Sequence, residues 1–275
     1  MDLIIQIGGW IAAMAVTGLV AGFVAGLLGV GGGIVIVPVL DIALGAFNVD
    51  PSIRMKVAVA TSLATIMATS LASARAHHRA GAVDLALLKS WGPMIFVGVV
   101  LGTIIAGMVD GQVLSVVFAT TALIVSANMV LRAKSHKLFD DFPNGVVKSA
   151  LGILVGTISA MMGIGGGTLG VPILTIFGTD IRRAVGTASA IGFIIAIPGT
   201  IGYVITGWDV AGLPPFSLGY VNLVAVTAII PLSMLAAPWG ARTAHTIPRE
   251  ALAYGFGAFL TLTAIKMYAG LLIGI

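Results

Sequence analysis

The sequence contains no cysteine. This absence excludes disulfide bonds, thiolate nucleophiles and metal sites built on cysteine. Other catalytic patterns are missing as well, because the chain has no His-Glu-x-x-His motif and no pair of acidic residues within an apolar segment. We therefore expect a protein that is not an enzyme, with no catalytic residues, no cofactor and no bound metal ion.

Charged residues are also scarce. They make up 9% of the 275 residues, whereas hydrophobic residues make up 59% and the mean hydropathy is +1.13. A soluble domain carries about 25% charged residues, so lipid is the expected solvent for most of this chain. The apolar runs are continuous rather than alternating, which predicts membrane-spanning helices and not a β-barrel.

The apolar runs divide into ten segments, which predict an all-α polytopic membrane protein. The first has no basic residues before it, so we expect a retained helix rather than a cleaved signal peptide. The second and seventh are too short to cross an apolar core of about 30 Å, because a helix rises about 1.5 Å per residue. The ten segments are residues 3–29, 33–46, 56–75, 89–108, 113–132, 147–163, 167–178, 184–206, 219–241 and 250–273.

An internal repeat relates the two halves of the chain. Residues 18–40 and 152–174 are identical at nine of 23 positions at an offset of 134 residues, and Ala58–Thr61 likewise matches Ala184–Thr187. Each repeat holds five segments, an odd number, so we expect the halves to have inverted topology, as in many secondary transporters. The predicted domains are a first repeat, a cytoplasmic linker and a second repeat, at residues 1–131, 132–146 and 147–275.

Basic residues collect in the loops on one side. If the N-terminus is outside, eleven basic residues lie in inner loops and only two, Arg54 and Lys56, lie in outer loops. We therefore expect a multi-pass protein of the cell (inner) membrane with both termini outside. The pI near 9.6 then reflects membrane topology, and we expect no nucleic-acid partner. The inner-loop residues are Arg75, Arg79, Lys89, Arg132, Lys134, Lys137, Lys148, Arg182, Arg183, Arg242 and Arg249.

A glycine-rich motif occurs once in each repeat, at 29–33 and 163–167. Three adjacent glycines, each costing about 1 kcal/mol in a helix, followed by a proline predict an unwound stretch that leads into a short helix. The free N–H groups and the helix dipole would then favour an anion. The alternative is a structural hairpin with glycine for close packing; the duplication favours a site. The predicted binding residues are Gly31, Gly32, Gly33, Pro38, Gly165, Gly166, Gly167 and Pro172.

Hydroxyl residues follow each glycine motif and are further candidates for the site. A hydroxyl donates to an oxyanion without the cost of burying a cation. The alternative is hydrogen bonding between helices or back to the same helix. The predicted residues are Thr61, Ser62, Thr168, Thr187 and Ser189, of which Thr61 and Thr187 are favoured because the repeat preserves them.

Small residues recur every fourth position in the first and sixth segments, as Gly18 and Gly22 and as Gly152 and Gly156. We expect these stripes to serve close helix packing rather than binding.

Few ionisable residues lie within or beside the segments. Lys266 could attract an anion, but we favour a side chain that reaches the outer interface. Asp41 could carry a coupling proton, but we favour a position where the chain leaves the membrane. The adjacent His77 and His78 point about 100° apart on a helix, so we expect a basic interface rather than a metal site.

The motifs at 26–40 and 160–174, with the segments that follow them, resemble the TauE/SafE family of sulfite and organosulfonate exporters. The resemblance covers essentially the whole chain. It implies a secondary transporter, or permease, that exports a small sulfur-containing anion such as sulfite or sulfoacetate by alternating access. An anion channel on the same scaffold and a non-transporting membrane assembly partner remain alternatives. The expected partners are that anion and the lipid bilayer, and a homodimer is left open.

Overall fold

The computed structural model describes residues 2–28, 32–131, 139, 141–244 and 247–273. The predicted site residue Gly31 lies outside these residues, as does much of the predicted linker. The described residues form ten helices: α1 (Asp2–Leu28), α2 (Gly33–Ala46), α3 (Pro51–Arg79), α4 (Leu85–Met108), α5 (Gly111–Leu131), α6 (Gly145–Met162), α7 (Gly166–Ile176), α8 (Ile181–Thr206), α9 (Leu223–Ala244) and α10 (Arg249–Ile273). They follow the ten predicted segments in order.

Six of these helices are long and apolar enough, by length and composition, to cross a membrane: α3, α4, α5, α6, α8 and residues Leu223–Gly240 of α9. The helices α2 and α7 have only 14 and 11 residues. Large apolar side chains are exposed along the outside, among them Ile124, Leu235 and Leu262, whereas Thr61 and Thr187 are buried. This distribution suits a protein surrounded by lipid, and it confirms the prediction of a polytopic helical membrane protein.

In the part of the chain that the structure describes, one small β-hairpin interrupts the otherwise helical fold. Strands β1 (Ser217–Leu218) and β2 (Val221–Asn222) are antiparallel, with Ser217 opposite Asn222. The hairpin lies between α8 and α9, where the prediction began a helix at residue 219. Instead, α9 begins at Leu223 because the Asn222 side chain accepts a hydrogen bond from the Ala225 N–H and caps the helix.

Three helices begin with an aspartate cap, at Asp50, Asp84 and Asp180. The Asp50 carboxylate accepts hydrogen bonds from the hydroxyl and the N–H of Ser52, which hold the pKa of Asp50 below its usual value. With this cap and Pro51 in the first turn, α3 begins at residue 51 rather than at the predicted 56. The apolar pattern missed this first turn because it contains Arg54.

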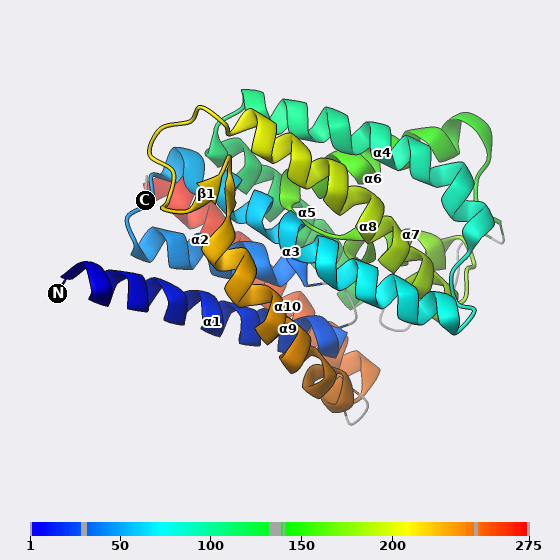
Figure 1. Cartoon of the computed structure of the whole chain (residues 1–275). Helices are drawn as coiled ribbons and strands as arrows, with labels where there is room; N and C mark the ends of the chain where they lie inside the picture. The colour runs from blue at the N-terminus through cyan, green and yellow to red at the C-terminus, as the bar shows by residue number, and fades with distance from the viewer. Residues whose placement is uncertain (1, 29–31, 132–138, 140, 245–246, 274–275) are drawn as a thin grey trace.

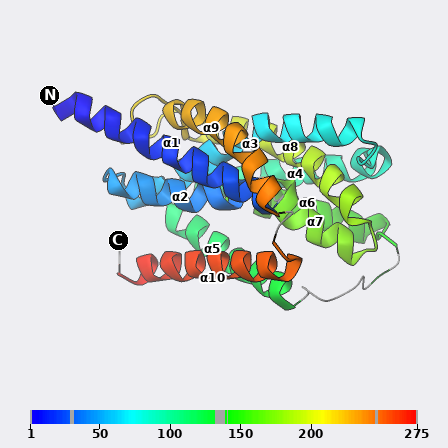
Figure 2. The ribbon, with the colours of Figure 1, turned by 90° about the horizontal axis from the view of Figure 1, so that it is seen from below.

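The helices pack in pairs (Figure 1 and Figure 2). Helix α1 lies along α9, α6 along α4, α3 against α8, and α5 against α10. Glycines permit the first two contacts: a Cβ at Gly22 would lie 2.4 Å from the Ser233 Cα, and a Cβ at Gly156 would lie 2.1 Å from the Ile95 carbonyl oxygen. The predicted packing role of the small-residue stripes is therefore confirmed.

Helix α1 begins and α10 ends at the same end of the molecule (Figure 1). At this end, the Asp41 side chain of α2 meets Lys266 of α10. The end of α3 and the starts of α4 and α8 lie at the opposite end, where Arg183 pairs with Asp84 at 3.2 Å. We refer to this second end as the basic end, because it carries most of the predicted inner-loop cations.

Candidate functional site

The two glycine motifs meet inside the molecule. A Cβ at Gly33, the first residue of α2, would lie 2.6 Å from the Gly163 carbonyl oxygen and 3.0 Å from the Ile164 Cα. The Ser62 hydroxyl of α3 donates to the same Gly163 carbonyl at 2.7 Å. Residues 130 positions apart, Gly33 and Gly163, are therefore in direct contact, and the starts of α2 and α7 lie close together.

The starts of α2 and α7 carry no capping side chain, because Gly32 and Gly165 occupy the capping positions. Gly32 has φ of 75°, a left-handed conformation that favours glycine. The first N–H groups of a helix have no acceptor within the helix, and the dipole gives this end a partial positive charge. No acidic residue occupies the first turn of either helix, so nothing in those turns neutralises the two helix starts.

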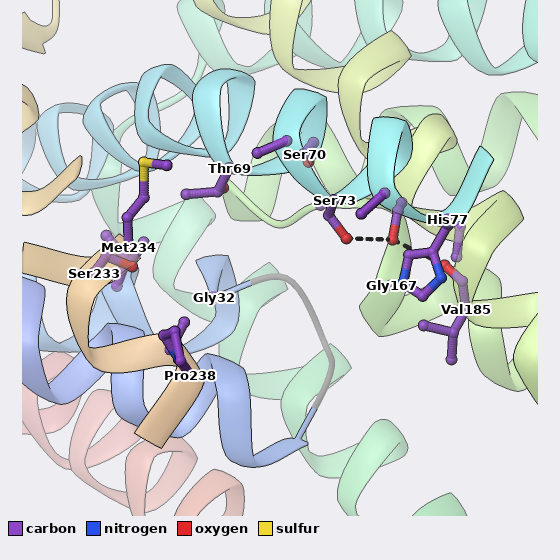
Figure 3. A pocket seen from close by; sticks show the side chains of 18 residues that line it. Gly32, Thr69, Ser70, Ser73, His77, Gly167, Val185, Ser233, Met234 and Pro238 are labelled. Carbon is purple, nitrogen blue, oxygen red and sulfur yellow. Dashed lines mark hydrogen bonds between the residues drawn. The ribbon is translucent and has the colours of Figure 1, made fainter. Parts of the chain in front are cut away.

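A cavity of about 570 Å³ reaches both helix starts (Figure 3). It is lined by the starts of α2 and α7, the second half of α3, the first half of α8 and the second half of α9. Its polar surface comes from peptide groups, hydroxyls and one imidazole. The lining residues are Gly32, Ile36, Thr69, Ser70, Ala72, Ser73, Ala76, His77, Gly165, Gly166, Gly167, Val185, Ala188, Ser189, Ser233, Met234, Ala237 and Pro238.

Five of the thirteen predicted site residues line this cavity, namely Gly32, Gly165, Gly166, Gly167 and Ser189. The Ser189 hydroxyl donates to the Val185 carbonyl at 2.9 Å and accepts from the Ser73 hydroxyl at 3.1 Å. This contact joins α8 to α3 across the cavity wall (Figure 3).

Thr61 and Thr187 lie elsewhere, although the repeat preserves them. Each is fully buried, and each oxygen accepts a backbone N–H at the start of a helix in the other half. Thr61 accepts from Asn222 at 3.0 Å, and Thr187 accepts from Asp84 at 2.9 Å. Both hydroxyls therefore form hydrogen bonds between the two halves. Hydrogen bonding between helices was the alternative to anion binding in the sequence analysis.

The other predicted residues that the structure describes are not among those that line the cavity. Gly33 and Ser62 contact the Gly163 carbonyl, while Pro38 and Pro172 lie further along the short helices. The Thr168 hydroxyl is buried and has no hydrogen-bond partner among the described residues.

The polar stripe on α3 was missed by sequence reasoning. Thr69, Ser70, Ser73 and His77 all line the cavity. Their spacing of three and four residues is that of one helix face, and this signal was available in the sequence. It was overlooked because Thr69, Ser70 and Ser73 align with an apolar residue or glycine in the second repeat.

Towards the end opposite the basic end, helices α3 and α8 pack closely against each other. A Cβ at Gly199 would lie 2.9 Å from the Leu63 Cδ1, so these helices touch there without polar groups. Tyr203 is buried, and its hydroxyl donates to the Ala160 carbonyl at 3.2 Å. The Tyr203 ring packs edge-on against Tyr220 beside the hairpin, and burial raises the pKa of Tyr220.

A second cavity of about 590 Å³ lies near the start of α3 and the end of α10. There, the buried Asp41 carboxylate binds two cations: its Oδ1 lies 2.9 Å from Arg54 Nε, and its Oδ2 lies 3.0 Å from Lys266 Nζ. The sequence analysis did not predict this ion pair. Lys266 pairs with a carboxylate, and Asp41 lies within α2, which corresponds to the second predicted segment.

These features together define a multi-pass helical membrane protein in which two short helices begin at one internal cavity. The chain belongs to the family described as sulfite exporter TauE/SafE, whose profile matches residues 14–267. Similar proteins include a probable membrane transporter protein of Haemophilus influenzae, 34% identical over 91% of this chain and 95% of that protein.

Two further relatives carry the same description. YunE of Bacillus subtilis is 27% identical over 70% of this chain and 78% of its own length. A protein of Methanocaldococcus jannaschii is 25% identical over 80% of this chain and 81% of its own length. No solved structure matches the chain.

Proposed function

We propose that this protein is a secondary transporter that exports a small sulfur-containing anion, such as sulfite or sulfoacetate, by alternating access. The observation that carries the proposal is the meeting of two uncapped glycine helix starts at one cavity. Peptide N–H groups and two helix dipoles would replace the water around the anion. The family description, and the names of the relatives in Haemophilus and Bacillus, support a transporter of this class rather than an enzyme.

The charge of the cavity also supports an anion. Among its lining residues there is no Asp or Glu, so no carboxylate opposes a negative ligand. The hydroxyls of Ser70, Ser73 and Ser189 can donate to oxyanion oxygens. The binding surface that we propose is therefore narrower than the predicted one: Gly32, Gly165–Gly167 and Ser189, together with Ser70 and Ser73.

Two inverted halves are the second part of the proposal. The helix pairs are those expected if a two-fold axis exchanges the halves: α1 with α9 becomes α6 with α4, while α3 with α8 and α5 with α10 each map onto themselves. The hydrogen bonds of Thr61 and Thr187 follow the same two-fold relation, because each threonine oxygen accepts from the N–H at the start of a helix in the opposite half. Such symmetry is typical of transporters that rock one half against the other.

Equivalent positions in the two repeats have different surroundings, and this difference supports alternating access. The match of Thr61 with Thr187 sets an offset of 126 residues, which aligns Leu63 with Ser189 and Ser73 with Gly199. The polar contact Ser73–Ser189 borders an open cavity, whereas the equivalent contact Leu63–Gly199 is packed and apolar. We infer an inward-open state whose cavity opens towards the basic end, which would attract anions from the cytoplasm.

Transport in proteoliposomes tests the proposal. We expect saturable movement of radiolabelled sulfite or sulfoacetate, driven by an ion gradient. A Gly166→Leu variant, which places a side chain against α8 at the cavity, should insert but lose transport. Gly255→Leu is a matched control, because no atom lies within 4 Å of a Cβ there, and it should transport normally. If the wild type moves no sulfur anion under any gradient, the proposal is wrong.

A channel on the same scaffold gives a different result. It would conduct anions in a planar bilayer without a coupled ion, and its flux would not saturate at low anion concentration. An assembly partner would show neither activity, and the Gly166→Leu substitution would instead disrupt a complex.

A further inference from the structure

One ionisable side chain lines the cavity that reaches the two helix starts. Among the lining residues, His77 is the only Asp, Glu, Lys, Arg or His. His77 lies one helical turn beyond Ser73, whose hydroxyl donates to Ser189, so it belongs to the same end of the cavity (Figure 3). His77 was expected to form part of a basic interface together with His78, but only His77 lines the cavity.

We propose that His77 binds the transported anion in its protonated form, so that anion and proton bind together and anion affinity rises as the pH falls. The inference rests on the proposed function and adds to it a proton that binds together with the anion. Imidazole is the side chain whose charge normally changes between about pH 8 and pH 5. Protonation adds a full positive charge and a second N–H donor to a cavity that otherwise offers hydroxyls and peptide dipoles.

The position of His77 on α3 fits this role. Ser70, Ser73 and His77 are spaced by three and four residues, so they share one face of the helix. His77 lies in the last turn of α3, which ends at Arg79, and a positive charge is stabilised at that end of a helix. An anion that enters from the basic end would meet His77 first, then Ser73, and finally the glycine helix starts.

Attraction between the anion and the imidazolium couples the proton to the anion. The acidic groups at the neighbouring helix starts are Asp84, which pairs with Arg183, and Asp180, which accepts from the Arg182 N–H. A bound anion would attract the added positive charge of a protonated His77, so anion binding favours the protonated imidazole. By linkage, the proton then strengthens anion binding by the same factor. The titratable groups at this end include Arg75, His78 and Arg79 on α3, Asp84 and Lys89 at the start of α4, Lys148 on α6, Asp180, Arg182 and Arg183 at the start of α8, and Arg242 on α9, while the described part of α7 has none.

The equivalent position in the second repeat lacks such a group. The offset of 126 residues aligns His77 with Tyr203, which is buried and donates to the Ala160 carbonyl. At this pair of equivalent positions, a side chain that titrates near neutral pH is thus present in the first repeat and not in the second. This asymmetry would let the protein take up a proton with its anion at the basic end.

Binding measurements on the detergent-solubilised protein test the inference. The probe is sulfoacetate, whose acidic groups stay ionised from pH 5.5 to 8, so the ligand itself does not titrate. We expect the Kd of the wild type to fall about tenfold from pH 8 to pH 5.5, within the usual range of linkage. His77→Gln should hold the weak, high-pH affinity at every pH. His77→Lys, with a permanent charge, should bind tightly throughout.

His78→Gln is the matched control. His78 is exposed and does not line the cavity, so this variant should keep the pH profile of the wild type. The role of His77 is refuted if His77→Gln keeps the wild-type profile, or if the wild type binds sulfoacetate equally at all pH values. If His77→Gln does not fold, a pH-dependent Kd in His77→Lys refutes it equally. Binding without transport would contradict the proposed function alone. A wild type that binds no sulfoacetate at any pH overturns the inference, and the sulfite transport assay then decides the proposed function.

Discussion

Substitution of Gly166 by alanine tests whether the start of α7 must lie against α8. The added Cβ would lie 2.3 Å from the Ala188 carbonyl oxygen and 2.7 Å from the Gly192 N. Both atoms belong to the backbone of α8, so no side-chain rotation relieves the overlap. An increase from 2.3 Å to an ordinary contact of 3.4 Å requires a displacement of 1.1 Å.

The cost of this displacement can be estimated. Overpacking in a closely packed interior destabilises by about 1–3 kcal/mol, while loss of glycine from the unfolded chain returns about 0.4–1 kcal/mol. We expect Gly166→Ala to lower the free energy of unfolding by about 1–2 kcal/mol, which corresponds to a Tm lower by about 2–8 °C. We also expect at least a tenfold loss of anion affinity, because the N–H groups move away from the cavity.

The neighbouring glycine is the control. A Cβ at Gly165 would meet its nearest atom, Ile66 Cγ2, at 3.4 Å, and φ of −81° is allowed for alanine. Alanine is a poorer helix cap than glycine but constrains the unfolded chain, so the two effects nearly cancel. Thermal unfolding in detergent, followed by circular dichroism, should leave Gly165→Ala within about 0.5 kcal/mol of the wild type. Equal Tm values for Gly166→Ala and Gly165→Ala would refute this reasoning.

Two other substitutions test the contacts that hold the helices together. Asp41→Asn leaves Arg54 and Lys266 without their shared carboxylate, and we expect it to destabilise by about 3 kcal/mol; an unchanged Tm would show that the two cations have other partners. Thr187→Val keeps the shape of the side chain but leaves the Asp84 N–H without its acceptor, and we expect a loss of about 1–3 kcal/mol in the same assay. If Thr187→Val has the same Tm as the wild type, this hydrogen bond between the halves contributes nothing to stability.

The helices of this protein could be predicted from the sequence because they depend on local composition. Continuous apolar runs, interrupted by glycine, proline and charged loops, mark the ten segments and the two short ones. The boundaries at Pro51 and Leu223 could not be read from hydropathy, because the caps Asp50 and Asn222 set them through hydrogen bonds to nearby residues.

Part of the lining of the candidate site could be predicted from the sequence, and whether these residues bind an anion stays a prediction. The glycine motifs at Gly32 and Gly165–Gly167 line the cavity, because a helix that breaks there must leave its N–H groups free. The repeat also selected Thr61 and Thr187, but it cannot distinguish a residue kept for binding from one kept for packing.

Amino-acid composition and the repeat by themselves determined that this chain is a helical membrane protein with two interrupted helices, because lipid demands apolar segments and glycine breaks them. Only the tertiary structure decided which side chains face the cavity and which ions pair. Helical periodicity predicts which residues share one face of a helix, but the packing of the helices determines whether that face contacts another helix, the cavity or lipid. For this reason His77 lines the cavity while His78 does not, and Lys266 meets Asp41 across 225 residues of sequence.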